Sequence, residues 1–254
     1  MPVVYHNLVY FVIVKRETRE IFRYAAPFAT WLVLQTLLPA TALAYAIRSA
    51  ATAFVGVCCW RFATGGTPVV PVCRSGETPL PPGEGHHAGA AALVAAAGIL
   101  LGVLVTVLWI APECSAFYRT WFCWPLGALP AESAAPSPYD PAVCGWLLTV
   151  AKLVGSAFVI APVEEVFFRS FLYRWLQNRD FRAVPLSRFN LSAFLWMVFL
   201  FTLEHDRPLA AAVAGALYGF AAIRLGLAGA IAAHVTTNLL LALYVIHQNA
   251  WAFW

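Results

Sequence analysis

Several apolar runs of about 20 residues constrain this chain more than any other feature of its sequence. The chain has 254 residues, of which 61% are hydrophobic and 11% charged, and its mean hydropathy is +0.74. One such run is long enough for a helix to cross the hydrocarbon core of a bilayer. Backbone amides must be satisfied within the membrane, and long runs without alternation fit helices rather than barrel strands. We therefore expect an all-α, polytopic membrane helical bundle.

Seven segments are expected to cross or nearly cross the membrane. They are residues 24–46, 49–60, 88–110, 141–177, 189–205, 208–224 and 227–247. An eighth helix would be counted if the apolar residues 8–14 also joined the bundle. The sequence has no sustained internal repeat and no linker, so we expect a single membrane-embedded domain over residues 1–254.

Charge predicts the orientation and excludes one class of partner. Basic residues at 15–23 precede the first long span, and more basic residues follow the fourth span at 174–188. Basic residues concentrate on the cytoplasmic side of membrane proteins, which predicts a cytoplasmic N-terminus. The net charge of +4 is small and spread over loops, so the lipid bilayer is an expected partner and nucleic acid is not.

The fourth span contains two adjacent carboxylates and an arginine within the apolar sequence APVEEVFFRS. Ionisable groups at membrane depth usually face a bundle interior or a wet cavity and have a function there. On a helix Glu165 and Arg169 are i,i+4 neighbours that can pair, while Glu164 points about 100° away. Pro162 is expected to kink the helix just before these residues. We therefore expect Glu165 to be structural and Glu164 to be available for chemistry.

Two further polar pairs occur in the last three spans. Phe201 and His205 share one helix face, and so do His234 and Asn238, because each pair is four residues apart. A carboxylate beside an imidazole can hold and deprotonate a water molecule. A second imidazole and an amide can donate hydrogen bonds to an oxyanion forming on a carbonyl group. With Glu164, these side chains form a chemically coherent set for hydrolysis.

Three sequence motifs resemble those of a known family, the CAAX prenyl endoprotease and bacteriocin-processing superfamily of intramembrane proteases. The EExxxR motif begins at Glu164, the FxxxH motif at Phe201 and the HxxxN motif at His234. Each motif alone is weak, but three in order on separate apolar helices are a specific signal. The resemblance covers residues 141–247.

The resemblance implies a helical bundle around a polar intramembrane cavity, and an intramembrane endopeptidase that needs no cofactor. Glu164 and His205 would then activate the water, and His234 and Asn238 would form the oxyanion hole. The supporting residues would be Glu165, Arg169 and Phe201. The substrate would be a membrane-anchored protein or peptide.

Residues 184–186 and 251–254 also resemble a bacterial branch of this family that is associated with exosortase sorting systems. This resemblance implies a location in the bacterial inner membrane and an exosortase-type sorting system as a partner. Motifs do not carry a substrate from one member to another, so the identity of the substrate stays open.

The predicted depths of these residues agree only in part. With 1.5 Å of rise per residue, Glu164 lies about 20 Å from the end of its helix, and His205 lies about 24 Å from Phe189. His234 lies only about 12 Å from the turn at Gly226 by the same arithmetic. A tilt, a kink or a recessed turn must account for the difference.

Two other classes of function remain open from sequence. A zinc metalloprotease could use His205, His234 and a glutamate as ligands. The chain has no HExxH motif, and an asparagine suits an oxyanion donor better than a zinc ligand, which favours metal-free chemistry. A non-catalytic transporter or immunity-type membrane protein would also carry polar residues in its core. No inverted halves are visible in the sequence, and the three motifs are intact.

Overall fold

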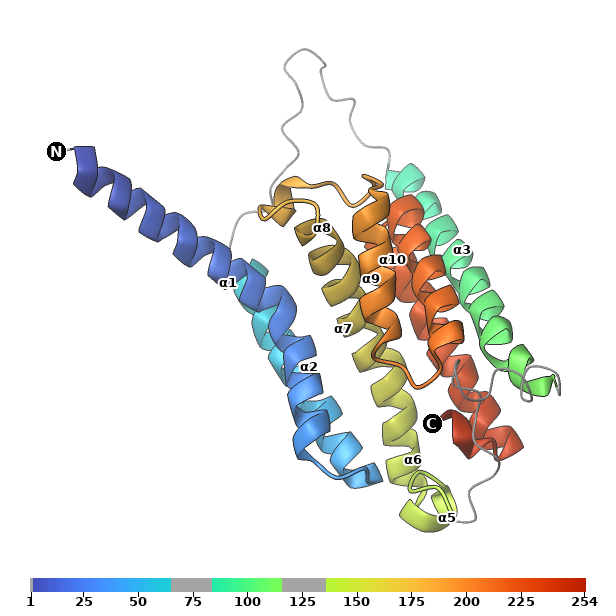
Figure 1. Ribbon diagram of the computed structural model, residues 1–254. Coiled ribbons are helices and arrows are strands. Elements are labelled where there is room, and N and C mark those ends of the chain that lie inside the picture. The colour runs from blue at the N-terminus through green and yellow to red at the C-terminus, as the bar shows by residue number, and fades with distance from the viewer. Residues whose placement is uncertain (1, 65–83, 116–135) are drawn as a thin grey trace.

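The computed structural model describes residues 2–64, 84–115 and 136–254, and every regular element among them is helical (Figure 1). The elements are α1 (Pro2–Leu37), α2 (Ala42–Thr64), α3 (Glu84–Ile110), η1 (Ala111–Cys114), α5 (Pro141–Cys144), α6 (Trp146–Val154), η2 (Gly155–Ile160), α7 (Ala161–Glu165), η3 (Val166–Leu172), α8 (Tyr173–Trp175), η4 (Phe181–Ala183), α9 (Leu191–Thr202), α10 (Pro208–Gln248) and η5 (Trp251–Phe253).

Four stretches of the described residues are long and apolar enough to cross a membrane. They are Ala42–Cys59, Gly89–Glu113, Trp146–Trp175 and Pro208–Gln248, and α9 is a shorter apolar helix. The prediction of an all-helical membrane bundle is thereby confirmed. Most of the two segments that connect the predicted spans 49–60, 88–110 and 141–177 lies outside the described residues.

The first two helices have different boundaries from those predicted. Helix α1 runs without a break to Leu37, so residues 8–14 belong to it and form no separate span. It ends nine residues before the predicted limit of 46, because the residue before Pro39 is disfavoured in a helix. Thr41 Oγ1 then accepts a hydrogen bond from the Ala44 amide at 3.2 Å and caps α2. This turn is almost as apolar as its flanking helices, which is why hydropathy did not separate them.

The helix that carries the two carboxylates is continuous from Trp146 to Trp175. It begins five residues later than predicted, because Gly145 has a φ of +80° and separates it from α5. Pro162 lies in α7, and two π-helical stretches, η2 and η3, stand on either side of that element. In η2 the Ala161 amide bonds the carbonyl of Ser156, five residues back. The hydrogen-bond pattern therefore shifts just before the proline, which has no amide hydrogen to donate.

Helix α10 is a hairpin of two antiparallel arms, residues 208–225 and 227–248. The turn is Gly226, with φ +76° and ψ 177°, a backbone conformation that is essentially restricted to glycine. The rings of Tyr218 and His234 are 4.5 Å apart, although 16 residues of straight helix would separate them by about 24 Å. The two arms correspond to the two last spans predicted from sequence.

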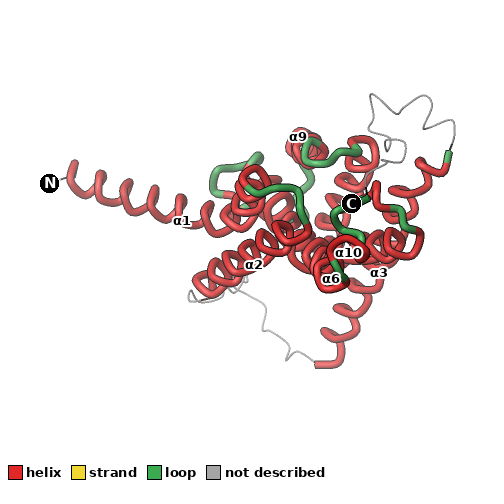
Figure 2. The backbone as a smooth tube through the Cα atoms, turned by 90° about the horizontal axis from the view of Figure 1, so that it is seen from below, coloured by secondary structure: helices red, strands yellow, loops and turns green. Residues whose placement is uncertain are grey.

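Helix α10 is the centre of the bundle and contacts α3, α6, α7 and α9. Viewed along the helices, α10 lies between α6 and α3 (Figure 2). Two glycines of α3 allow the second arm to approach closely. A Cβ at Gly98 would lie 2.6 Å from the carbonyl oxygen of Gly229, and a Cβ at Gly102 would collide with the carbonyl of Ala233. Thr237 Oγ1 donates a hydrogen bond to the Gly102 carbonyl at 3.0 Å. Small residues at such positions are typical of membrane helices in contact.

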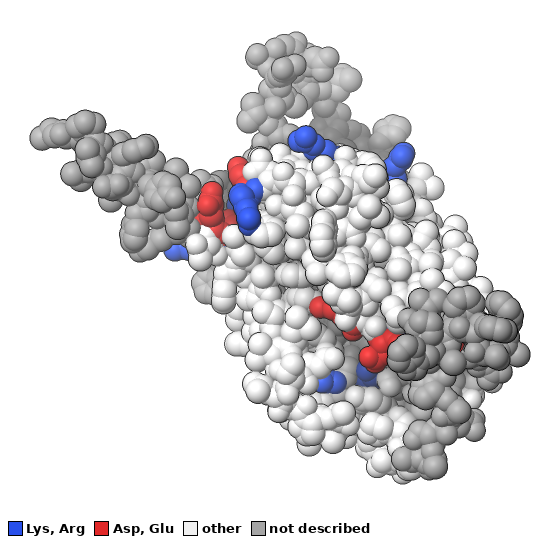
Figure 3. Space-filling model, viewed as in Figure 1, with Lys and Arg blue, Asp and Glu red and all other residues white. Residues whose placement is uncertain are grey.

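The outer surface of the bundle is mostly uncharged, as contact with lipid requires. In Figure 3 the charged atoms gather mainly at the upper end of the molecule, with a few in a hollow lower on the same face. Many large apolar side chains of the helices are exposed, among them Phe54, Leu100 and Leu195. This pattern agrees with an integral membrane protein.

The contact between α3 and α10 generates a first prediction. Gly98→Ala should destabilise the protein by about 1 to 3 kcal/mol, because the new methyl group meets backbone that cannot move aside. Gly56→Ala is the matched control, because its methyl group would meet nothing within 4 Å. That change should be neutral or slightly stabilising, since alanine favours a helix over glycine by roughly 0.5 to 1 kcal/mol. Thermal unfolding in detergent measures both, and equal effects would contradict the close packing.

Candidate active site

The pair formed by Glu165 and Arg169 is fully buried. Arg169 Nη1 lies 3.0 Å from Glu165 Oε1, and both side chains are 0% exposed. The i,i+4 pairing expected from sequence is therefore present. Arg169 Nη2 also donates to the Gly215 carbonyl at 3.3 Å, and its guanidinium carbon lies 4.5 Å from the centroid of the Phe201 ring. The helix from Trp146 to Trp175 carries the EExxxR motif and is called the motif helix from here on. The arginine thus connects the motif helix to the first arm of α10.

His234 lies between the two carboxylates of the motif helix. Its Nδ1 is 2.9 Å from Glu165 Oε1, and its Nε2 is 3.8 Å from Glu164 Oε2. The imidazole also stacks on the ring of Tyr218, with 4.5 Å between centroids and 19° between planes. An ionised Glu165 can only accept, so Nδ1 carries a hydrogen and Nε2 faces Glu164. The sequence did not predict the contact of His234 with Glu165, because it joins residues 69 positions apart.

His205 lies in the loop that joins α9 to α10. Its Nδ1 is 2.9 Å from the carbonyl oxygen of Phe201. A carbonyl oxygen only accepts hydrogen bonds, so Nδ1 is the donor, and the neutral imidazole keeps a lone pair on Nε2. The FxxxH spacing therefore acts through the backbone of Phe201 as well as its ring, which lies 4.6 Å from the imidazole. This arrangement leaves Nε2 free to accept a hydrogen bond from water.

Asn238 is held by a carbonyl of the motif helix. Its Nδ2 donates to the Ser156 carbonyl at 3.0 Å. An amide nitrogen carries two hydrogens, so one remains for another acceptor. The contact depends on η2, because Ser156 lies in that π-helical stretch and its carbonyl also receives the Ala161 amide.

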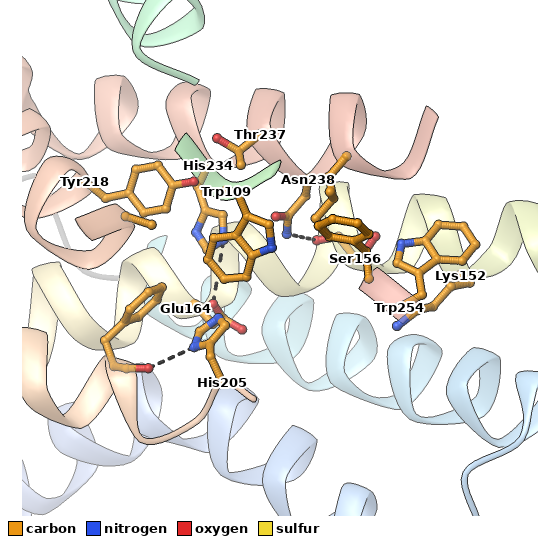
Figure 4. Close-up of a pocket in the computed structure, with 14 residues that line it drawn as sticks. Trp109, Lys152, Ser156, Glu164, His205, Tyr218, His234, Thr237, Asn238 and Trp254 are labelled. Carbon is orange, nitrogen blue, oxygen red and sulfur yellow. Dashed lines mark hydrogen bonds and ion pairs between the residues drawn. The ribbon is translucent and has the colours of Figure 1, made fainter. Parts of the chain in front are cut away.

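The four predicted catalytic residues line one pocket of about 200 Å³. Figure 4 shows Glu164, His205 and His234 near one another, with Tyr218 toward one end and Lys152 with Trp254 at the other. The structure describes no hydrogen bond or ion pair between Glu164 and His205, and the basic partner within 4.0 Å of Glu164 is His234. The difference in predicted depth is resolved, because His234 does reach the level of Glu164.

Several other residues at this pocket were not assigned a role from sequence, among them Trp109, Lys152, Ser156 and Tyr218. Tyr218 could have been suspected, because it is a buried polar side chain in an apolar helix, whereas the roles of the others depend on contacts between helices. Among the described residues, no three His, Cys, Asp or Glu side chains are grouped so that they could hold a metal ion. Whether the chemistry is metal-free stays a prediction.

The buried ion pair generates a second prediction. Arg169→Met should destabilise the protein by about 3 to 5 kcal/mol, because Glu165 would remain buried without its cation. Arg179→Gln removes an exposed cation that lies over an aromatic ring, Trp175, and should have little effect. Expression level and thermal unfolding measure both variants. A stable Arg169→Met protein would show that the pair does not hold these helices together.

One family of known proteins matches the part of the chain that carries this site. Residues 146–240 match the family model described as type II CAAX prenyl endopeptidase Rce1-like. No curated protein and no solved structure matches the chain. The matched segment contains all three motifs and the four predicted catalytic residues. Residues 146–240 are therefore similar to the type II CAAX prenyl endopeptidases of the Rce1-like family, which are proteases.

Proposed function

We propose that the protein is an intramembrane endopeptidase that hydrolyses a peptide bond of a membrane-anchored substrate with a water molecule activated by Glu164. The observation that supports this proposal most directly is the convergence of Glu164, His205, His234 and Asn238 on one pocket. These side chains come from the motif helix, the α9–α10 loop and the second arm of α10. They supply a base, a water acceptor and hydrogen-bond donors, which are the groups that peptide hydrolysis needs.

The first step is the attack of water on the scissile carbonyl carbon. Glu164 takes one proton of the water, and the lone pair on His205 Nε2 accepts a hydrogen bond from the other, so the water oxygen points at the substrate. The carbonyl π electrons move to its oxygen, which becomes an oxyanion. The second N–H of Asn238 is available to donate to this oxyanion, because the first already bonds the Ser156 carbonyl.

His234 is a donor to the oxyanion only after its Nε2 gains a proton. Glu164 carries the proton of the water after the attack, and its Oε2 is 3.8 Å from Nε2. A shift of that proton to His234 forms an imidazolium, which Glu165 stabilises at Nδ1. The proton passes to the leaving amine when the carbon–nitrogen bond breaks. This sequence of steps reconciles the expected oxyanion role of His234 with its position between two carboxylates.

The pocket extends toward the end of the bundle that is opposite to the basic loop at 177–190. Trp109 is next to the end of α3, and Lys152 is near the start of the motif helix, whereas Arg174 lies at the other end of that helix. With the N-terminus and the basic loop in the cytoplasm, this pocket faces the outer side of a bacterial inner membrane. That location would suit a substrate of an exosortase-type sorting system, and we propose such a system as the partner.

The third prediction tests the catalytic set with a prenylated CAAX peptide in lipid vesicles as the probe. Glu164→Gln should lower kcat/KM by about 10² to 10⁴-fold, the usual contribution of a general base. Asn238→Ala should lower it by about 10² to 10³-fold, the usual contribution of one oxyanion donor. Both variants should insert and unfold like the native protein. The control is Asp180→Asn, which removes an exposed carboxylate in the loop that follows the motif helix. Full activity of Glu164→Gln would overturn the mechanism.

The fourth prediction distinguishes metal-free hydrolysis from the zinc-dependent alternative. Treatment of the purified protein with a strong chelator should leave turnover unchanged, because the mechanism uses Glu164 and His205 to activate water without a Lewis acid. Elemental analysis of the same preparation should find no stoichiometric zinc. Loss of activity that added zinc alone restores would instead make His205, His234 and a glutamate metal ligands.

A further inference from the structure

Two cations lie close together at the end of the pocket that holds Trp254. Lys152 Nζ is 3.9 Å from the centroid of the Tyr45 ring, and the guanidinium carbon of Arg48 is 5.0 Å from the same centroid. Arg48 is 7% exposed and belongs to α2, whereas Lys152 belongs to α6 and lines the pocket. The positive charges of two different helices are thus held beside one buried aromatic ring.

No carboxylate among the described residues forms an ion pair with either cation, whereas two other buried arginines, Arg169 and Arg207, each have one. The nitrogen Nε of Arg48 also has no hydrogen-bond partner. Aromatic rings do surround the charges: Lys152 lies 4.8 Å from the centroid of Tyr139, and Arg48 lies 4.8 Å from that of Trp31. Such rings attract each cation but cannot neutralise two like charges that are buried together.

We propose that Lys152, supported by Arg48, forms an anion subsite of the catalytic pocket that binds a carboxylate of the peptide substrate. This proposal rests on the proposed peptidase function and adds a determinant of substrate choice. Lys152 shares its pocket with Glu164 and Asn238. A single bound peptide can therefore reach both the cation and the site of hydrolysis. Figure 4 shows Lys152 separated from Glu164 along the length of the pocket.

The distance between Lys152 and Glu164 along the motif helix indicates how far the bound carboxylate of the substrate lies from the scissile bond. Lys152 and Glu164 are 12 residues apart, which is at most about 18 Å of helix. An extended peptide advances about 3.3 Å per residue, and the lysine side chain shortens the remaining gap. The bound carboxylate therefore belongs to a residue about three to five positions from the scissile bond, as either a side chain or a chain terminus.

The burial of the cluster favours a peptide over a lipid headgroup. A cation that holds a lipid phosphate needs access from the bilayer, but Arg48 and Tyr45 are both buried, at 7% and 3% exposure. Lys152 is reached through the pocket instead. A lipid phosphate is the alternative occupant that the experiment must detect.

The test uses pairs of membrane-anchored peptides in which one member has a carboxylate and the other has the matching neutral group. One pair compares a C-terminal acid with its amide, and a second compares an internal glutamate with glutamine. The native protein should show a kcat/KM about 10- to 100-fold higher for the acid, the usual effect of a hydrogen bond to a charged group. Lys152→Met should remove this preference, so that the ratio of kcat/KM for the acid peptide to that for the neutral peptide falls to about one. Lys152→Arg should restore most of the preference, and Arg179→Gln is the control for loss of a cation outside the pocket.

Equal losses for the acid and neutral peptides in Lys152→Met would show a structural role and overturn the proposal. So would a native protein that does not distinguish the two peptides. The same pairs are measured in vesicles with and without anionic lipid. A Lys152→Met effect that follows the lipid composition rather than the peptide charge would assign the site to a lipid phosphate.

Binding of the same peptides to Glu164→Gln in vesicles separates this proposal from the proposed function. Preference of this variant for the acid peptide, lost on adding Lys152→Met, would support the subsite even if the native protein hydrolysed neither peptide. Hydrolysis of both peptides with no preference in binding would support the peptidase and reject the subsite.

Discussion

The buried ion pair of Glu165 and Arg169 is the interaction on which the rest of the site depends. A charged group inside a membrane bundle must be paired and hydrogen-bonded, because removing either charge from water is strongly unfavourable. Each member of this pair also contacts α10: Arg169 donates to the Gly215 carbonyl in the first arm, and Glu165 accepts from His234 in the second. The pair therefore sets the position of both arms relative to the motif helix.

Hydrogen-bond acceptors then decide what each imidazole can do. The Phe201 carbonyl takes the Nδ1 hydrogen of His205, and the Glu165 carboxylate takes that of His234. Both rings consequently direct Nε2 to other partners. The two histidines differ in what Nε2 meets, because His234 faces Glu164 at 3.8 Å whereas His205 contributes to the pocket wall. This difference supports separate roles for them in hydrolysis.

Close helix packing and irregular helix geometry complete the pocket. Gly98 and Gly102 allow α3 to pack closely against the second arm of α10, which carries His234 and Asn238. The π-helical stretch η2 presents the Ser156 carbonyl to Asn238. Such stretches are often found at functional sites, because a change in hydrogen-bond spacing exposes backbone groups and rotates side chains. The turn at Gly226 allows both arms of α10 to line one cavity.

The sequence by itself determined the interactions that repeat along one helix. Hydropathy indicated the membrane helices, and i,i+4 spacing predicted the pairing of Glu165 with Arg169. Phe201 and His205 are in contact as expected, but His205 lies beyond the end of α9 rather than on a shared helix face. The three motifs indicated the similarity to CAAX proteases. The turn around Pro39 was missed because it is as apolar as the helices that it joins.

Only the tertiary structure decided how the helices meet. It placed His234 between Glu164 and Glu165, and it brought Lys152 beside Arg48 and Tyr45. The spacing of residues along the sequence predicts which of them share a face of one helix. The partner of that face depends on tilt, rotation, π-helical stretches and the approach that glycine allows, and these are properties of the packed bundle.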